Sequence, residues 1–181
     1  YGGGPGMVLQ IEPIAQTLKE QKEFHRSSGR ETHSILVTPQ GRPFSQEKAR
    51  ELSSKKAVLT LICGRYEGFD ERLRSLVDEE ISGGDFICMG GEVITMTMIE
   101  TISRLVPDVL GNQESAVHES FTQPMLEFPQ YTRPASFEGM EVPKELKSGN
   151  HKIIAQWREE QALARTKNRR PELLQCKTKI K

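Results

Sequence analysis

The sequence predicts an α/β protein with a mainly parallel sheet. Three short runs rich in strand-forming residues, "SILVT" (34–38), "AVLTLI" (57–62) and "DFIC" (85–88), each end at a turn that contains glycine. A stretch of helical character follows each run, and strands that alternate with helices are typical of parallel sheets. Ligands of such sheets bind beyond the carboxyl ends of the strands. The three glycine turns therefore predict one binding site.

The first part of the chain supplies the helices that this architecture needs. Apolar residues at 11, 14, 15 and 18 have the spacing of a helix with one apolar face, and the polar stretch "KEFHRSSGRET" after it predicts a surface loop. Further helices are predicted at 45–52, with Ser45 as the N-cap, at 70–77 and at 93–106. The chain opens on the glycine loop "YGGGPGM", and we expect an N-terminal segment before it.

The last third of the chain has a different composition. Periodicity fades from residue 111 to 134, which predicts an interdomain connection, and a basic helix is predicted from about residue 150. Residues 144–181 hold 11 Lys and Arg against 4 Asp and Glu, which leaves 14 against 21 for residues 1–143. A basic tail on an acidic body indicates a polyanionic partner such as nucleic acid, although a solvated helical appendage would have the same charge.

Several classes of function lack their motifs here. The sequence has no Walker-type phosphate loop, no G-x-G-x-x-G after a strand, no H-E-x-x-H and no G-x-S-x-G. The three cysteines are far apart and indicate reduced thiols, with Cys63 and Cys88 expected in the core. No window approaches 18 uninterrupted apolar residues, so we expect a cytoplasmic protein that spans no membrane. A glycine-lined pocket with carboxylates and arginines remains, which suits a small polar cofactor.

Seven strings now identify a resemblance to a known family. They are "YGGGPGM", "CGRYEGFDER", "DEEISGGDF…MGGE", "SRLVPDVLG", "YTRPASFEGMEVP", "LKSGNHKII" and "RTKNRRPELL". In this order, from residue 1 to about 174, they resemble the bacterial tRNA (guanine-37-N1)-methyltransferases of the TrmD family, within the SPOUT superfamily. The resemblance implies a knotted α/β domain that binds S-adenosylmethionine, a homodimer with active sites at the subunit interface, and a C-terminal domain that grips tRNA.

The resemblance also sets the expected domain boundaries. Residues 1–110 would form the SPOUT domain, a parallel sheet with a deep trefoil knot, here without the first strand and helix of the family. Residues 111–134 would be the interdomain linker. Residues 135–181 would form a small all-helical tRNA-binding domain. Magnesium dependence is implied as well, but the sequence shows no set of ligands for the ion.

Two residues are expected to carry the chemistry. Guanine N1 holds a proton near neutral pH, so methylation needs a base for that proton and a cation beside O6. By its place in "SRLVP", Arg104 is the expected cation. Glu119 stands where the family has an aspartate and is the expected base, although it is longer by a methylene group. His118 is a second candidate base, and a third possibility is that this stretch is a solvated loop and that the base lies elsewhere.

The resemblance assigns the cofactor to the three glycine turns. The expected cofactor-binding residues are Leu36, Val37, Thr38, Pro39, Gly64, Arg65, Tyr66, Glu67, Gly68, Ser82, Gly83, Asp85, Phe86, Cys88, Gly90, Gly91 and Ile94. Gly83, Phe86 and Ile94 depart from the family, which has a larger apolar residue, a tyrosine and a proline there. Asp70 and Arg72 could also face the ligand, or could instead form a helix cap and surface pairs. For any single turn, glycine could simply make the chain reverse tightly.

Contacts with tRNA are expected from both ends of the chain. Pro5 and Gly6 would face the guanine. The expected phosphate contacts are Lys152, Arg158, Arg165, Lys167, Arg169 and Arg170. Trp157 would either stack on a base or pack with Ile153 and Ile154. Two other functions stay open: an RNA-binding relative that has lost the base, and a SPOUT methyltransferase that acts on another RNA.

Overall fold

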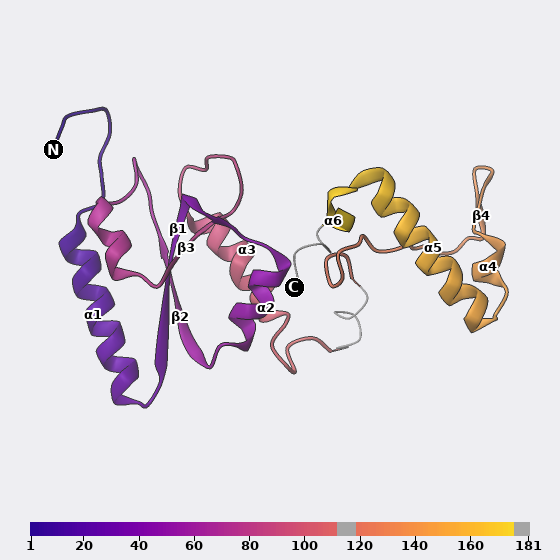
Figure 1. The fold of residues 1–181 in the computed structure, drawn as a ribbon, viewed down its shortest axis with the longest axis horizontal. Coiled ribbons are helices and arrows are strands. Elements are labelled where there is room, and N and C mark those ends of the chain that lie inside the picture. The colour runs from indigo at the N-terminus through magenta and orange to yellow at the C-terminus, as the bar shows by residue number, and fades with distance from the viewer. Residues whose placement is uncertain (112–118, 176–181) are drawn as a thin grey trace. The chain divides into compact units, whose positions relative to one another are not determined.

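The computed structural model describes residues 1–111 and 119–175 of the chain (Figure 1). The chain divides into two compact units, Tyr1–Gly111 and Asn112–Lys181, and each is described by itself. The first unit holds the sheet and the second holds the long basic helix.

The first unit is built on a three-stranded parallel sheet in the order β2-β1-β3. Its strands are β1 (Glu31–Pro43), β2 (Ala57–Cys63) and β3 (Glu79–Ser82). The predicted α/β class with a parallel sheet is confirmed. The third strand was predicted six residues too late, because 85–88 lies in the turn that follows β3. Strand β3 was not predicted because it begins with two adjacent carboxylates, Glu79 and Glu80. In the fold, both are paired with cations from other elements.

Helices cover both faces of this sheet (Figure 1). They are α1 (Ile11–Ser27), α2 (Gln46–Ser54), the 3₁₀ turn η1 (Glu71–Leu76) and α3 (Glu92–Ser103). Ser45 is the N-cap of α2, as predicted, because its Oγ accepts a hydrogen bond from the Lys48 amide at 3.2 Å. Helix α1 is longer than predicted, since most of the expected loop continues the helix. It ends only where Gly29 takes a φ of +68°.

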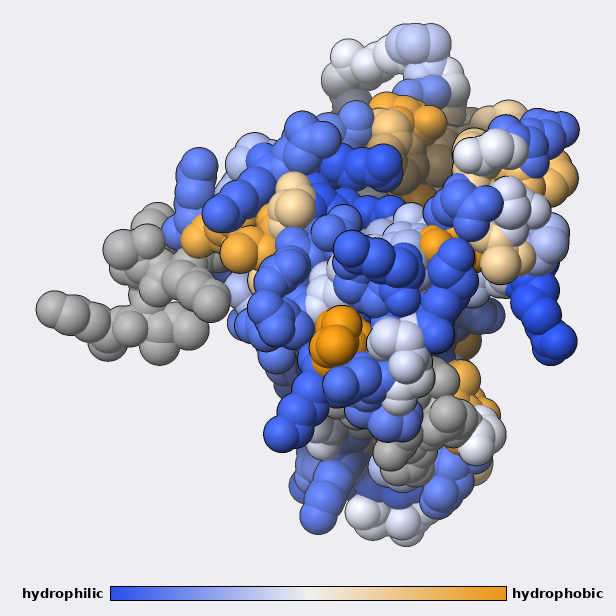
Figure 2. All heavy atoms as spheres, turned by 90° about the vertical axis from the view of Figure 1, so that its right-hand side faces the viewer, coloured by the Kyte–Doolittle hydropathy of each residue, from blue (hydrophilic) through white to orange (hydrophobic). Residues whose placement is uncertain are grey.

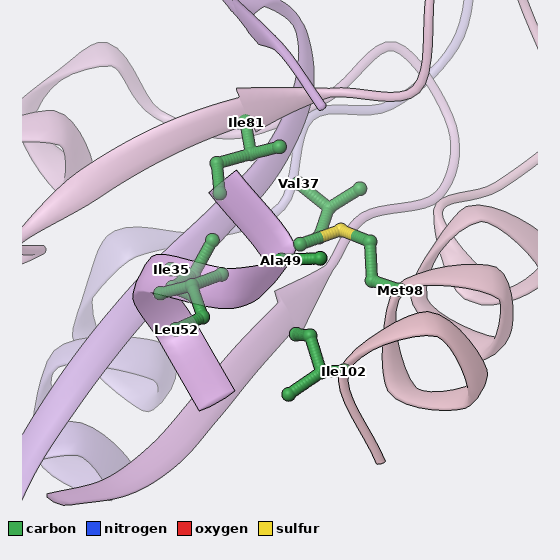
Figure 3. Close-up of a cluster of buried hydrophobic side chains, with 7 residues drawn as sticks. All are labelled: Ile35, Val37, Ala49, Leu52, Ile81, Met98 and Ile102. Carbon is green, nitrogen blue, oxygen red and sulfur yellow. The ribbon is translucent and has the colours of Figure 1, made fainter. Parts of the chain in front are cut away.

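The core lies on both faces of β1 because successive side chains of a strand point to opposite sides. On one face, residues from β1, α2, β3 and α3 converge (Figure 3). They are Ile35, Val37, Ala49, Leu52, Ile81, Met98 and Ile102. On the other face, Leu36 packs with Leu18 of α1 and Leu73 of η1. The central strand is therefore buried from both sides and fixed in position.

The second unit is mainly helical. Its elements are β4 (Ser136–Phe137), β5 (Met140–Glu141), α4 (Lys144–Lys147), α5 (His151–Arg169) and α6 (Glu172–Gln175). Asn150 caps α5 through hydrogen bonds from two backbone amides. The expectation of an all-helical part was wrong in one respect, because β4 and β5 form a small hairpin. Its turn, Glu138 and Gly139, has positive φ at both positions, the conformation that tight hairpins favour.

The chain before this hairpin lies against α5. The Leu126 amide donates to Thr166 Oγ1 at 2.9 Å, and Arg165 Nη1 donates to the Glu127 carbonyl at 3.4 Å. The Arg158 guanidinium stands 4.7 Å from the centre of the Phe128 ring. The described part of the stretch expected to be a connection is therefore anchored on a helix.

Candidate functional site

A cavity of about 540 Å³ lies where the three parallel strands of the first unit end. Its walls come from the end of the β1–β2 ladder, from the turn after β2 and from the turn after β3. Every residue predicted to bind the cofactor lines this cavity except Asp85. The residues that the resemblance assigned to the cofactor thus lie around one cavity, although one of the three strands was predicted at the wrong residues.

A shift in the register of β1 shapes the first wall. The pairing of β1 with β3 is interrupted between Val37 and Arg42, and Thr38, Pro39 and Gln40 lie in that interval and line the cavity. Such irregularities redirect side chains at the edge of a site.

The second and third turns are fastened to each other. The Gly91 amide donates to the Gly64 carbonyl at 2.9 Å. The backbones of Arg65 and Gly90 pair in an isolated antiparallel β-bridge. Arg65 Nε also lies 2.7 Å from Glu92 Oε1. The pKa of Glu92 is lowered by its own backbone amide and by Arg65. These contacts join two walls of the cavity.

Glycine is required where these turns approach other groups. A Cβ at Gly64 would lie 2.5 Å from Phe69 Cε2, and a Cβ at Gly91 would lie 3.2 Å from Cys63 Cα. Gly68 has a φ of +109° and makes the chain reverse. Some of these glycines are thus needed for close contact with neighbouring groups, and Gly68 is needed for a tight turn.

The N-terminal glycine loop contacts the second turn of the cavity. The Glu67 amide donates to the Met7 carbonyl at 2.9 Å, and the Leu9 amide donates to the Gly68 carbonyl at 2.9 Å. A Cβ at Gly6 would lie 2.6 Å from Glu67 Cγ. The loop that carries Pro5 and Gly6 is thus next to a residue that lines the cavity.

Asp70 and Arg72 take the structural role that the sequence left open. Asp70 caps η1 by accepting from the Arg72 amide at 2.9 Å, and the two side chains form an ion pair at 2.7 Å. Hydrogen bonding from the Arg72 side chain, followed by that from its backbone, lowers the pKa of Asp70 to about 2. Asp70 also lines the cavity, whereas Arg72 does not.

Arg74 is a cavity residue that sequence reasoning missed. Its guanidinium joins three elements, with Nε 2.8 Å from Glu71 Oε1 and further contacts to Glu80 and Gln40. The pKa of Arg74 is raised by its bonds to Glu71 and Glu80. Its partners on β1 and β3 are adjacent only in the fold. In the sequence, Arg74 is only one of several charged residues in a short helical segment, so nothing local distinguishes it.

The two cysteines of the first unit differ from the expectation that both lie in the core. Cys63 is half-buried, with its sulfur 3.0 Å from Thr95 Oγ1. Cys88 is exposed and lines the cavity, because 85–88 is part of a turn and not of a buried strand.

The expected catalytic residues belong to different units. Arg104 is the C-cap of α3 and is half-buried, and its amide donates to the Glu100 carbonyl at 3.2 Å. Glu119 is half-buried in the second unit, where its carbonyl accepts from the Thr122 amide at 3.2 Å. His118 lies outside the described residues.

Comparison with known proteins places this arrangement in a family. The family model described as tRNA (Guanine-1)-methyltransferase TrmD matches residues 1–176. The chain belongs to the TrmD family. A tRNA (guanine-N(1)-)-methyltransferase of Syntrophotalea carbinolica is 54% identical over 97% of this chain and 69% of its own length. Proteins of the same name from Symbiobacterium thermophilum and Staphylococcus haemolyticus are each 53% identical, over 97% and 96% of this chain and 70% and 69% of their own lengths.

The basic residues expected to meet tRNA in a TrmD family member gather on α5. Lys152, Arg158, Lys167, Arg169 and Arg170 are exposed, whereas Arg165 is half-buried. Arg158 and Arg165 also hold the segment before the hairpin. Trp157 is half-buried, and its ring lies 6.3 Å from that of Tyr131.

Among residues 1–111 and 119–175, no group of three or more His, Cys, Asp or Glu side chains has the arrangement of a metal site. Within the same residues, no helix has the length and apolar character needed to cross a membrane.

Proposed function

We propose that this chain transfers the methyl group of S-adenosylmethionine to N1 of guanosine 37 in tRNA, next to the anticodon. The observation that supports this function best is the cavity at the carboxyl ends of three parallel strands, in a chain of the TrmD family. Its volume of about 540 Å³ falls within the range of about 300–1,000 Å³ found for small-molecule sites.

The lining of the cavity fits the chemistry of S-adenosylmethionine. Backbone groups of the glycine turns, at Gly64, Phe86, Cys88 and Gly90, would surround the adenine and ribose. Carboxylates and guanidinium groups line the same space and suit a zwitterionic ligand; they are Arg65, Glu67, Asp70, Glu71 and Arg74. When bound, S-adenosylmethionine supplies an electrophilic methyl group.

The protein's part in the chemistry is to manage one proton and one developing charge. The Glu119 carboxylate takes the proton from guanine N1, which frees the nitrogen lone pair for attack on the methyl group. The Arg104 guanidinium stabilises the negative charge that develops on O6. Glutamate is one methylene group longer than the aspartate that the resemblance implies here, so either the backbone of this stretch would stand further from the guanine or the transfer would be slower.

The apolar side chains exposed on α3 and on the turn before it suit a homodimer interface; they are Ile87, Met89, Val93, Met96 and Ile99. We propose that this surface forms the dimer and that the active sites lie at the interface.

A deep trefoil knot in the first unit is proposed on the resemblance, as are magnesium dependence and a cytoplasmic location. The second unit would bind tRNA through the cations of α5.

Methyl transfer to a defined tRNA tests the activity. Purified protein, S-adenosylmethionine and Mg²⁺ are incubated with a transcript that has guanosine at positions 36 and 37, and the digested RNA is analysed by mass spectrometry. If the proposed function is correct, guanosine 37 gains the mass of one methyl group. A parallel reaction without Mg²⁺ tests whether the activity depends on the ion. tRNA that is bound but never methylated would indicate the RNA-binding relative instead. Methylation that persists after guanosine 37 is replaced by adenosine would indicate another SPOUT activity.

A charge-removing substitution tests the base. We expect Glu119→Gln to lower the single-turnover rate by about 10²- to 10⁴-fold, the usual contribution of a general base. Glu127→Gln, in the same segment, is the matched control and should keep the rate of the parent protein. A Glu119→Gln variant with the full rate would remove Glu119 from this role.

A further inference from the structure

The second unit has a cavity of its own, of about 550 Å³, and of the residues that line it only Arg158 was expected to contact tRNA. The stretch 128–133 forms one wall, and α4 and the first turns of α5 form the others. The half-buried side chains of Val142, Leu146 and Ile154 contribute an apolar part of the lining. A concave site of this size with an apolar lining is suited to one small planar group.

Two flat groups in the lining are already held in place. The guanidinium of Arg158 stands 4.7 Å from the centre of the Phe128 ring. The Tyr131 ring pairs with Trp157 at 6.3 Å and is 47% exposed. Tyr131 and Arg158 therefore offer two planar surfaces whose ordering costs little on binding.

The charges of the lining have one sign. Arg133, Lys147 and Arg158 line the cavity, and its lining includes no carboxylate. Lys147 has a surface partner, because its Nζ lies 3.4 Å from Glu141 Oε2, with the two side chains 44% and 60% exposed. Such an exposed pair is weak and can yield to a stronger anion. Among the residues that the structure describes, Arg133 has no carboxylate partner.

We propose that this cavity binds one nucleotide of an RNA chain, with the base against Tyr131 and Arg158 and the phosphate beside Arg133 and Lys147. Unstacked RNA bases are recognised by aromatic side chains and guanidinium planes, and their phosphates by cations. An acidic peptide would satisfy the cations but would leave the planar surfaces without a partner. The choice of tRNA as the RNA rests on the proposed function.

The surroundings favour a nucleotide that is part of a chain over a free one. Arg165 follows Arg158 by seven residues, two turns along the same side of α5, so a second cation can meet a neighbouring phosphate. The face drawn in Figure 2 is mostly hydrophilic, and its apolar residues form separate patches among polar ones. Such a surface suits a wet, polar partner more than an apolar protein face.

Binding of tRNA to full-chain variants tests the proposal. Tyr131→Ala should raise the Kd for tRNA at least about 5-fold, the loss expected for one stacked base, whereas Tyr131→Phe keeps the ring and should bind as the parent does. Arg133→Ala should reduce the slope of log K against log salt by about one. Lys144→Ala, on α4 but outside the lining, is the matched control. Calorimetry with S-adenosylmethionine on each variant checks that the first unit is intact.

Crosslinking and competition identify the occupant. Ultraviolet crosslinking of tRNA, read by mass spectrometry, should place a nucleotide on the peptide that contains Phe128 and Tyr131. Crosslinks found only elsewhere, together with parental Kd values for Tyr131→Ala and Arg133→Ala, would overturn the proposal. The proposal would also be overturned if an oligoglutamate peptide displaced this crosslink at a lower concentration than competing tRNA does. Tight binding of free GMP that leaves the Kd for tRNA unchanged would overturn it as well.

The outcome is separable from that of the proposed function, because methyl transfer by the parent protein is measured on the same tRNA. If the parent methylates guanosine 37 but the variants bind like the parent, only the cavity proposal fails. If the parent transfers no methyl group but the variants lose RNA binding, the cavity remains a nucleotide site and the proposed function fails.

Discussion

Gly83 and Ile94, at which the resemblance implies a departure from the family, contact each other and can be tested as a pair. Gly83 follows β3, and Ile94 is in the first turn of α3. A Cβ at position 83 would lie 2.8 Å from both Cδ1 and Cγ2 of Ile94. Contacts that short do not persist, so the larger residue expected at position 83 is incompatible with Ile94 in its present place. We infer that Gly83 is small because Ile94 is large.

The perturbation is Gly83→Ala, alone and in the Ile94→Ala background. The backbone of Gly83 does not require positive φ, so the substitution acts through the collision and not through the backbone. Overpacking of this kind costs about 1–3 kcal/mol. Cγ2 is the more costly of the two contacts, because it is fixed by the stiff χ1 of a β-branched residue and cannot swing away as Cδ1 can. Both residues line the cavity, so the affinity for S-adenosylmethionine should fall with stability.

A double-mutant cycle measures the effect. Urea unfolding gives the free energy of unfolding of the four proteins, and calorimetry gives the Kd for S-adenosylmethionine. We expect Gly83→Ala to destabilise the parent by about 1–3 kcal/mol and to cost markedly less once Ile94→Ala has removed the clash, a coupling within the range of about 0.5–3 kcal/mol typical of residues in contact. Equal costs of Gly83→Ala in the two backgrounds would refute the steric explanation.

The pKa of Asp70 is lowered to about 2 by Arg72, so the stabilisation from this pair is present above the ordinary value of about 4 and is lost as the pH falls towards 2. Asp70→Asn should therefore lower the free energy of unfolding at pH 7 and have only a small effect at pH 2, where Asp70 is about half protonated in the folded protein; an equal effect at both would contradict the reasoning. Thr166 is fully buried, and Thr166→Val would leave the Leu126 amide unpaired at a cost of about 1–3 kcal/mol. Thr166→Ser, which keeps the hydroxyl group, is the control. Faster hydrogen exchange at the Leu126 amide would report the loss of its hydrogen bond.

Local signals in the sequence predicted the features that local physics determines. Ser45 was found because an N-cap needs only its own side chain and an amide three residues on. The strands β1 and β2 were found because their apolar runs are continuous. The three glycine turns could be grouped at one site because parallel strands must end at the same edge of a sheet.

The features that were missed depend on partners far along the chain. β3 begins with Glu79 and Glu80, which look unsuited to a half-buried strand until Lys48 and Arg74 are placed beside them. Thr166 gives no sign in the sequence that it anchors a segment forty residues earlier. Such pairings exist only once the fold has formed, so no local pattern reports them.

The turns around the cavity of the first unit are bonded to one another. The second and third turns are joined by the Gly91–Gly64 hydrogen bond and the Arg65–Glu92 ion pair, and the N-terminal loop is bonded to the second turn through Glu67. A ligand that enters need not order these segments, so less of its interaction free energy is lost to ordering. Glu119 belongs to the other unit, so in the proposed reaction the affinity for S-adenosylmethionine and the removal of the N1 proton depend on different parts of the chain. Substitutions should therefore separate the two: those in the turns should change the Kd for the cofactor, and those at Glu119 should change the rate while leaving that Kd as it was.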